Sequence, residues 1–145
     1  MTGRRLMTAF LIFVVLFGVA LWYAQHYAFY EETEAEAVTI AGQSYPVADW
    51  RGIDAATSPL KLRACFRIED RPVEAPVMEN PTPLVAPGWF ECFDAGQIAR
   101  DLASGSATAY LAETEEFEGA NRVVAVYPDG RAYMWRQLTP EYADQ

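Results

Sequence analysis

The sequence predicts an α+β fold: a small, mostly antiparallel sheet with at least one packed helix, preceded by an N-terminal transmembrane helix. Three observations predict it. No formal charge occurs between Leu6 and Tyr30. Residues 59–68 and 131–138 alternate apolar and polar side chains with the two-residue period of a strand. Residues 95–104 have helical apolar spacing between a capping aspartate and a glycine.

Residues 1–30 are expected to form a short cytoplasmic stub and a membrane anchor. The run LMTAFLIFVVLFGVALWYA matches the roughly 20 apolar residues that span a bilayer. Arginines precede it and acids follow it, so the positive-inside rule places the N-terminus in the cytoplasm and the C-terminal domain in the periplasm. An aromatic belt is expected at the far interface, formed by Trp22, Tyr23, Tyr27, Phe29 and Tyr30.

A cleavable signal peptide is the alternative interpretation of this segment. Gly18 and Ala20 are small at the two positions that a signal peptidase reads, so cleavage after Ala20 would fit. The apolar run continues past Ala20, however, and the aromatic cluster would be an unusual mature N-terminus. We therefore favour an uncleaved anchor in the inner membrane; under both interpretations the rest of the chain is exported.

The first part of the exported domain is expected to contain short strands. Residues 31–37 are interpreted as an acidic juxtamembrane spacer, and the domain proper as residues 38–145. Residues 38–47 predict two β segments around a turn at 41–43. Residues 49–58 hold turn-forming residues and predict an irregular segment.

The strand expected at 59–68 has two unlike faces. Its apolar face consists of Leu60, Leu62, Ala64, Phe66 and Ile68, while Cys65 lies on the opposite face with Lys61, Arg63 and Arg67. We expect that second face to be polar.

Residues 70–88 predict an extended surface loop. Prolines at 72, 76, 81, 83 and 87 forbid a helix and remove hydrogen-bond donors, which favours polyproline character. A loop of this length is usually functional or mobile.

A helix and a hairpin are expected in the rest of the chain. Residues 89–93 predict a short strand, and Asp94 caps a helix over 95–104 that ends at Gly105. A strand at 107–112 and an acidic loop at 113–121 follow. The hairpin 122–138 turns at Tyr-Pro-Asp-Gly, which fits a type I turn closed by a glycine bulge.

The two cysteines, Cys65 and Cys92, predict a structural disulfide. An even cysteine count in a small exported domain indicates pairing, and the two lie in predicted β segments at either end of the proline-rich loop. Redox catalysis, a copper site and two unpaired buried thiols are the alternatives. Glu91 and Asp94 disfavour redox catalysis, because carboxylates raise the pKa of a neighbouring thiol. Copper would need further soft ligands in a motif that the sequence lacks.

The charge of the exported part limits its partners. All 20 acidic residues follow residue 30, with 9 of the 11 basic ones, so this part carries 9 − 20 = −11. Phosphate repulsion therefore disfavours nucleic acid as a partner. Solubility explains the charge most simply; a basic periplasmic protein partner would also fit it.

The sequence offers no recognisable catalytic set, metal site or cofactor motif. His26 is the single histidine and belongs to the predicted interface of the anchor. A Ser-His-Asp triad, a Cys-His pair and an ordinary zinc site in the exported domain are therefore excluded. No phosphate-binding glycine motif occurs either. Acidic pairs such as Glu115 and Glu116 are interpreted as solvated loop residues rather than glycosidase carboxylates.

Five aromatic residues are candidates for an interaction surface: Trp50, Trp89, Phe90, Tyr133 and Trp135. Aromatic side chains dominate binding hot spots, but they also form the core of small sheets. The core is the simpler explanation.

The segments SPLKLRACF, GWFECFDAGQIARDLASGSATAYLAE and RVVAVYPDGRAYMWRQL carry a resemblance. The chain resembles a group of uncharacterised, single-anchor alphaproteobacterial membrane proteins defined as a domain of unknown function. Some members of the group carry a histidine kinase label. This chain has neither a cytoplasmic histidine nor a nucleotide-binding motif, so the resemblance implies location and fold and transfers no catalytic residue.

Together these features predict a non-enzymatic bitopic inner-membrane protein whose periplasmic domain serves as an interaction or assembly module of an envelope complex. The alternative is a periplasmic sensor or small-ligand-binding module with the proline-rich loop over a pocket. An enzyme of unfamiliar type is the third hypothesis.

Overall fold

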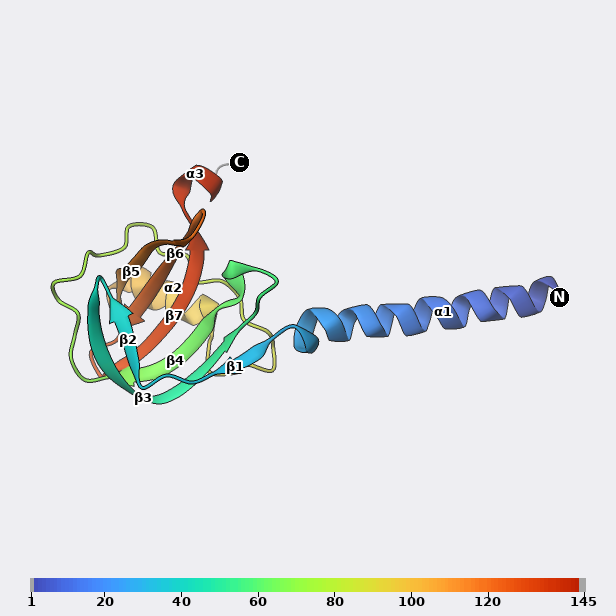
Figure 1. Ribbon diagram of the computed structural model, residues 1–145, viewed down its shortest axis with the longest axis horizontal. Coiled ribbons are helices and arrows are strands. Elements are labelled where there is room, and N and C mark those ends of the chain that lie inside the picture. The colour runs from blue at the N-terminus through green and yellow to red at the C-terminus, as the bar shows by residue number, and fades with distance from the viewer. Residues whose placement is uncertain (1, 144–145) are drawn as a thin grey trace. The chain divides into compact units, whose positions relative to one another are not determined.

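The computed structural model describes residues 2–143 and divides the chain into two units between Tyr30 and Glu31. The first unit is the helix α1 (Gly3–Tyr23), which continues into a π-helical turn, η1 (Ala24–Ala28) (Figure 1). The segment Gly3–Tyr27 has a mean hydropathy of 2.4 and is long and apolar enough to span a membrane. The predicted apolar helix is thus confirmed; the same length and composition also fit a signal sequence.

Aromatic rings gather at the end of this helix. Trp22 stacks on His26 with ring centroids 5.1 Å apart, and Tyr23 stacks on Tyr27 at 5.6 Å. These are pairs four residues apart, which share one face of a helix. The rings predicted to form an aromatic belt therefore include a stacked set that also contains the single histidine.

The second unit is an α+β domain, as the sequence predicts. Over the described residues, its strands form a seven-stranded antiparallel sheet in the order β1-β3-β4-β7-β6-β5, with β2 also paired to β3. The strands are β1 (Glu31–Thr33), β2 (Ala37–Ile40), β3 (Gln43–Asp54), β4 (Arg63–Ile68), β5 (Thr108–Phe117), β6 (Ala120–Val126) and β7 (Arg131–Leu138). The helices are η2 (Pro59–Lys61), α2 (Ala95–Ser104) and α3 (Pro140–Ala143).

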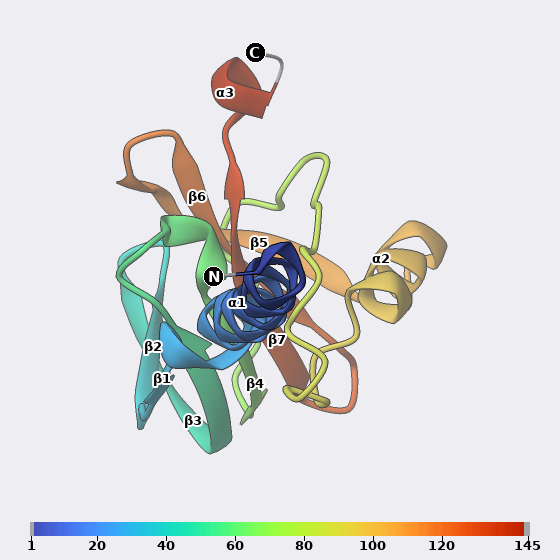
Figure 2. The ribbon, with the colours of Figure 1, turned by 90° about the vertical axis from the view of Figure 1, so that its right-hand side faces the viewer.

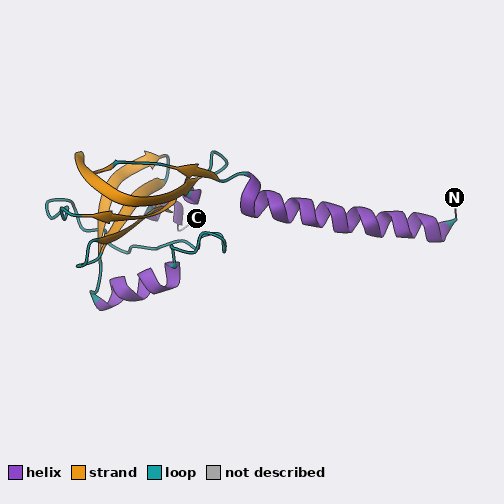
Figure 3. Ribbon diagram, turned by 90° about the horizontal axis from the view of Figure 1, so that it is seen from below, coloured by secondary structure: helices purple, strands orange, loops and turns teal. Residues whose placement is uncertain are grey.

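The sheet curls until the β2–β3 hairpin at one end of it reaches β5 at the other end. The backbone N–H of Ala41, at the tip of the β2–β3 hairpin, donates to the carbonyl of Ala112 in β5 at 2.8 Å. The inner face of this curl holds the hydrophobic core, which includes Ile40, Phe66, Val124 and Met134. The helix α2 lies on the outer face (Figure 2, Figure 3). Both faces of the one sheet are thus packed, the inner face by the core and the outer face by α2.

Local signals in the sequence are confirmed where turns and caps are concerned. Ala41 and Gly42 have φ values of 51° and 84°, as a tight hairpin with two left-handed residues requires. Gly130 closes the predicted β6–β7 turn with φ 92° and donates to the carbonyl of Tyr127 at 3.1 Å. Asp94 Oδ1 accepts the amide of Gln97 at the start of α2. Gly105, with φ 82°, ends the helix.

The interpretation of residues 31–37 as a spacer is wrong for its first part, because Glu31–Thr33 forms β1 along β3. Gly52 makes this pairing possible. A Cβ atom there would lie 2.7 Å from the Nε1 atom of Trp50 and closer still to the Thr33 hydroxyl. The Trp50 indole N–H instead donates to the Thr33 carbonyl at 2.8 Å. The domain therefore begins directly after the apolar segment.

Two expectations around β3 and β4 are also wrong. Residues 49–54 are not irregular but continue β3 through a bulge, at which Asp49 adopts φ 55°. An extra residue in one strand bends it without ending it. Pro59–Lys61 is a 3₁₀ turn rather than the start of β4. Its Pro59 is placed at the first turn, where the missing N–H costs nothing.

Residues 89–93 form turns instead of the predicted strand. The acidic loop predicted at 113–121 is reduced to two turn residues, because β5 runs on to Phe117. The acids there have partners: Glu116 Oε2 accepts the Nε–H groups of Arg122 at 2.9 Å and Arg136 at 3.1 Å. Neutralisation by two guanidinium groups lets an acidic sequence form a strand.

Candidate functional site

Cys65 and Cys92 form a disulfide across the outer face of the sheet, with their Cα atoms 6.4 Å apart. Cys65 belongs to β4, whereas Cys92 lies in the turn before α2 rather than in a facing strand. The face of β4 expected to be polar is covered: Arg63 and Cys65 are both buried, and only Arg67 is exposed there. The bond thus fastens the end of the proline-rich loop to the sheet.

The five aromatic residues that are candidates for an interaction surface do not make one surface. Trp135 is fully buried, Phe90 is buried, and Tyr133 packs edge-on against Phe93. Trp50 stacks on Phe66 at 5.2 Å. Trp50, Trp89 and Phe90 do line a common groove of about 710 Å³ beside β1. Most of this aromatic set therefore stabilises the fold, and three of its members reach that groove.

The proline-rich loop is fastened to the sheet at its first third. The amide of Met78 donates to the Ala109 carbonyl, and the amide of Leu111 donates to the Pro76 carbonyl, each at 2.8 Å. Val77 consequently bridges to Tyr110 of β5 in antiparallel fashion. This short segment extends the sheet beyond β5.

The middle of the loop is held by the side-chain amide of Gln137, which is only 5% exposed. Its Oε1 atom accepts the amide of Thr82 at 2.7 Å and the indole N–H of Trp135 at 3.0 Å. Its Nε2 atom donates to the Asn80 carbonyl at 3.1 Å. The Gln137 side-chain amide thus makes hydrogen bonds to the loop backbone of the kind that a neighbouring strand would make.

The last third of the loop is held by the buried guanidinium group of Arg63. Its Nε donates to the Leu84 carbonyl at 2.9 Å and its Nη2 to the Val85 carbonyl at 3.2 Å. Its Nη1 donates to the carbonyls of Leu60 and Leu62. The guanidinium carbon lies 5.8 Å from the centre of the Phe93 ring. Backbone carbonyls therefore receive the hydrogen bonds of a buried charge, which would otherwise be costly to bury.

Although the loop is fixed in this way, it leaves apolar side chains in solvent. Val73, Val77 and Val85 are 75%, 64% and 83% exposed. Over residues 81–88, Thr82, Val85 and Gly88 are exposed and the residues between them are partly buried. That period of three is typical of polyproline II. Among the described residues, no side chain packs over these exposed valines.

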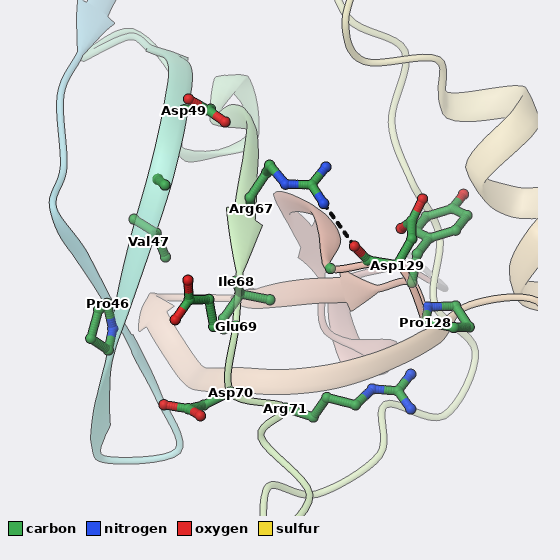
Figure 4. Close-up of a pocket in the computed structure, with 13 residues that line it drawn as sticks. Pro46, Val47, Asp49, Arg67, Ile68, Glu69, Asp70, Arg71, Pro128 and Asp129 are labelled. Carbon is green, nitrogen blue, oxygen red and sulfur yellow. Dashed lines mark hydrogen bonds between the residues drawn. The ribbon is translucent and has the colours of Figure 1, made fainter.

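A polar groove of about 740 Å³ lies between β3 and the β6–β7 turn (Figure 4). Arg67 and Arg71 extend toward the turn, and Arg67 Nη2 donates to the Asp129 carbonyl at 2.8 Å. Glu69 and Asp70 point toward β3. The groove therefore has carboxylates on both sides, and its two arginines extend toward the turn that carries Asp129.

Hydrogen bonds set the electrostatics near this turn. The backbone amide of Arg131 and then its guanidinium group donate to Asp129 and lower the pKa of that carboxyl. Burial raises the pKa of Tyr127, and its hydrogen bond to Asp101 raises it further. Both Tyr127 and Asp129 are thereby held in their ordinary charge states at neutral pH. Within residues 2–143, no group of three or more histidine, cysteine and acidic residues is arranged to hold a metal ion.

Sequence reasoning found the disulfide and the loop but missed the residues that hold the loop, Arg63 and Gln137. Both lie on strands, at positions of the alternating pattern that face away from the apolar core. The pattern gives the face on which a side chain lies but not the carbonyl that it reaches 20 to 60 residues away.

The model of a family of unknown function, DUF6446, matches residues 33–143. The match begins in β1 and ends in α3, so it covers nearly the whole second unit, including the loop and both cysteines. No curated protein and no solved structure matches the chain.

Proposed function

Because the chain belongs to DUF6446, a family of unknown function, we propose its function from its own geometry. It is a non-enzymatic, single-pass inner-membrane protein whose periplasmic domain presents the proline-rich loop to a protein of an envelope complex. One observation carries the proposal: residues 76–85 are fixed by backbone hydrogen bonds and by the buried side chains of Arg63 and Gln137, yet Val77 and Val85 face solvent.

Fixing a loop in advance lowers the entropic cost of binding, because the loop does not have to be ordered by its partner. Burying a guanidinium group costs free energy that a merely connecting loop does not require. The exposed valines therefore support a role in recognition, since loops on rigid scaffolds commonly carry it.

The proposed location is supported by charge and by the disulfide. Arg4 and Arg5 precede the apolar helix and glutamates follow it, which favours a cytoplasmic N-terminus. Disulfides persist in the periplasm and are rare in the cytosol. A C-terminal alkaline phosphatase fusion should be active and a C-terminal β-galactosidase fusion inactive; the opposite pattern would refute this orientation.

The interaction is tested by in-cell photocrosslinking from a benzoylphenylalanine introduced at Val85. The matched control is Ala99, which is also exposed but lies on α2. We expect Val85 to crosslink reproducibly to one envelope protein that Ala99 does not reach. Arg63→Lys should weaken that crosslink, because it removes the bidentate hold on the loop. No reproducible product at Val85, or the same product from Ala99, would contradict the proposal.

A small-ligand-binding module is the second candidate, and the polar groove of Figure 4, which carries two arginines, favours it. The space beneath residues 80–82 does not, because the buried Gln137 amide, which is also bonded to Trp135, contacts the loop backbone there. Arg67→Ala combined with Arg71→Ala would separate the two functions. It should remove ligand-induced thermal stabilisation if the groove binds a ligand, and leave the Val85 crosslink unchanged.

A further inference from the structure

We propose that an extended, basic segment of the partner adds to the sheet at Val77, as one more strand beyond β5. This inference rests on the proposed function and specifies how the loop is recognised. Its basis is the hydrogen-bond pattern around Val77. The bonds to β5 use the carbonyl of Pro76 and the amide of Met78, which flank Val77 on either side.

In an antiparallel pair, a residue between two such bonds turns its own N–H and C=O away from the neighbouring strand. The N–H and C=O of Val77 therefore point outward from the sheet. Neither has a hydrogen-bond partner among residues 2–143. A donor and an acceptor on one residue are what an incoming strand needs for a closely spaced pair of hydrogen bonds.

Two other sheet edges of the described domain are protected. β1 is three residues long and begins with two glutamates. The outer part of β5 carries Glu113, Glu115 and Glu116 and is interrupted by two register shifts. Charges, bulges and short strands are the usual means of preventing edge pairing. Val77 itself carries no charge and exposes an apolar side chain instead.

A groove of about 570 Å³ adjoins this edge and would receive a partner side chain. Its walls include Val77, Leu111 and Leu138, and the nearly buried amides of Asn121 and Gln137 form its polar part. Strand addition draws affinity from the backbone and specificity from such neighbouring pockets.

Charge decides the kind of partner. Glu74 and Glu79 are exposed on either side of Val77, and the exported part as a whole carries a formal charge of −11. A basic segment complements both. Pro76 and Pro81 bracket the edge, so the added strand is short and the complex is reversible.

The test uses the full chain in nanodiscs and a fluorescent probe peptide, acetyl-Val-Lys-Val-Lys-Val-amide. Val77→Pro removes the outward N–H without removing a hydrogen bond made within the described residues. Val77→Thr is the matched control, because it keeps the N–H and changes the side chain. We expect saturable binding to the wild type and to Val77→Thr, and about tenfold weaker binding to Val77→Pro, the effect of one or two lost hydrogen bonds.

An N-methylated probe, which lacks donors on its pairing edge, checks the same point without altering the protein and should bind as weakly. Equal binding to Val77→Pro, equal binding of the N-methylated probe, or no saturable binding to the wild type would each overturn strand addition. These outcomes leave the proposed function intact if Val85 still crosslinks to its partner. Loss of the Val85 crosslink instead refutes the proposed function itself.

Discussion

At the scale of single residues, the domain depends on charges that share one partner. Arg122 and Arg136 lie directly opposite each other on β6 and β7, which places two like charges side by side. Glu116 accepts a hydrogen bond from both, and Asp54 at the end of β3 forms an ion pair with Arg136 at 3.2 Å. Both arginines are buried. The carboxylate of Glu116 therefore has a structural role.

Glu116→Gln should destabilise the domain by about 2–3 kcal/mol, because it leaves two buried guanidinium groups with a weaker acceptor. This loss is smaller than that expected for a fully buried ion pair, since Glu116 is partly exposed. Glu113→Gln is the control. The Glu113 side chain is 47% exposed and lies 4.0 Å from Arg122, so its loss should cost under about 1 kcal/mol. Urea unfolding of the full chain in detergent measures both. Equal losses would contradict the assigned role of Glu116.

The close contact at Gly52 gives a second prediction at this scale. In Gly52→Ala, the new methyl group meets the Trp50 indole and the Thr33 side chain, so we expect a loss of about 1–3 kcal/mol from overpacking. The β1 amides should also exchange hydrogen faster. Gly88→Ala is the matched control, since nothing lies within 4 Å of its Cβ position. Hydrogen exchange at β1 that is unchanged in Gly52→Ala would show that the strand does not depend on this contact.

At the scale of elements, one hydrogen bond joins α2 to the sheet. The hydroxyl of Tyr127, which follows β6, donates to Asp101 Oδ2 in α2 at 2.6 Å. This bond is the main cause of the lowered pKa of Asp101. A carboxyl whose pKa is lower in the folded state contributes stability above its unfolded pKa of about 3.9, and loses that contribution as the pH falls through the folded value.

Tyr127→Phe should therefore lower the unfolding midpoint at pH 7, and the difference from wild type should shrink as the pH falls below about 4. In an Asp101→Asn background, the effect of Tyr127→Phe should not vary with pH over this range. Ionisation of Tyr127 does not interfere, because its raised pKa places that event at alkaline pH. Urea unfolding at a series of pH values measures the difference, and a difference that stays constant down to pH 3 would refute the coupling.

Sequence-based prediction succeeded for elements with local causes. The cap at Asp94, the glycine after α2 and both hairpin turns depend on neighbouring residues, and all are confirmed. It failed where a distant residue decides the outcome. β1 forms because two residues some twenty positions away allow it: Gly52 leaves room for Thr33, and Trp50 donates a hydrogen bond to the Thr33 carbonyl. The outer half of β5 exists because Arg122 and Arg136 neutralise its acids.

The same division applies to the candidate site. Proline spacing predicts an extended loop, and cysteine count in an exported domain predicts its disulfide, because these rules need no coordinates. The attachments to Arg63 and Gln137 are side-chain to backbone contacts over 21 to 57 residues. No periodicity in the sequence records them. They fix a loop whose length alone predicts that it is functional or mobile.

At the scale of the whole molecule, two kinds of restraint act on the loop, and they can be separated. The disulfide closes a separation of 27 residues, which is worth about 3.5 kcal/mol in the chain-entropy model. That stabilisation arises mainly in the unfolded chain, whereas Arg63 and Gln137 fix the loop in the folded one. Removing each restraint should therefore have a different signature.

In the double variant Cys65→Ala, Cys92→Ala, the free energy of unfolding should fall by about 3.5 kcal/mol, so the domain unfolds at a lower urea concentration. Residues 76–85 should nevertheless stay in place, because the hydrogen bonds from Arg63 and Gln137 remain. Arg63→Lys, with the disulfide intact, should instead raise the rate of protease cleavage within residues 80–88 under native conditions, because a loop that opens locally becomes a substrate. Limited proteolysis with mass mapping, run beside urea unfolding, measures both quantities. The contradicting result is loop cleavage in the double variant as fast as in Arg63→Lys, at a urea concentration where the double variant is folded. The disulfide rather than the guanidinium group would then hold the loop. The recognition surface would in that case depend on an oxidising compartment.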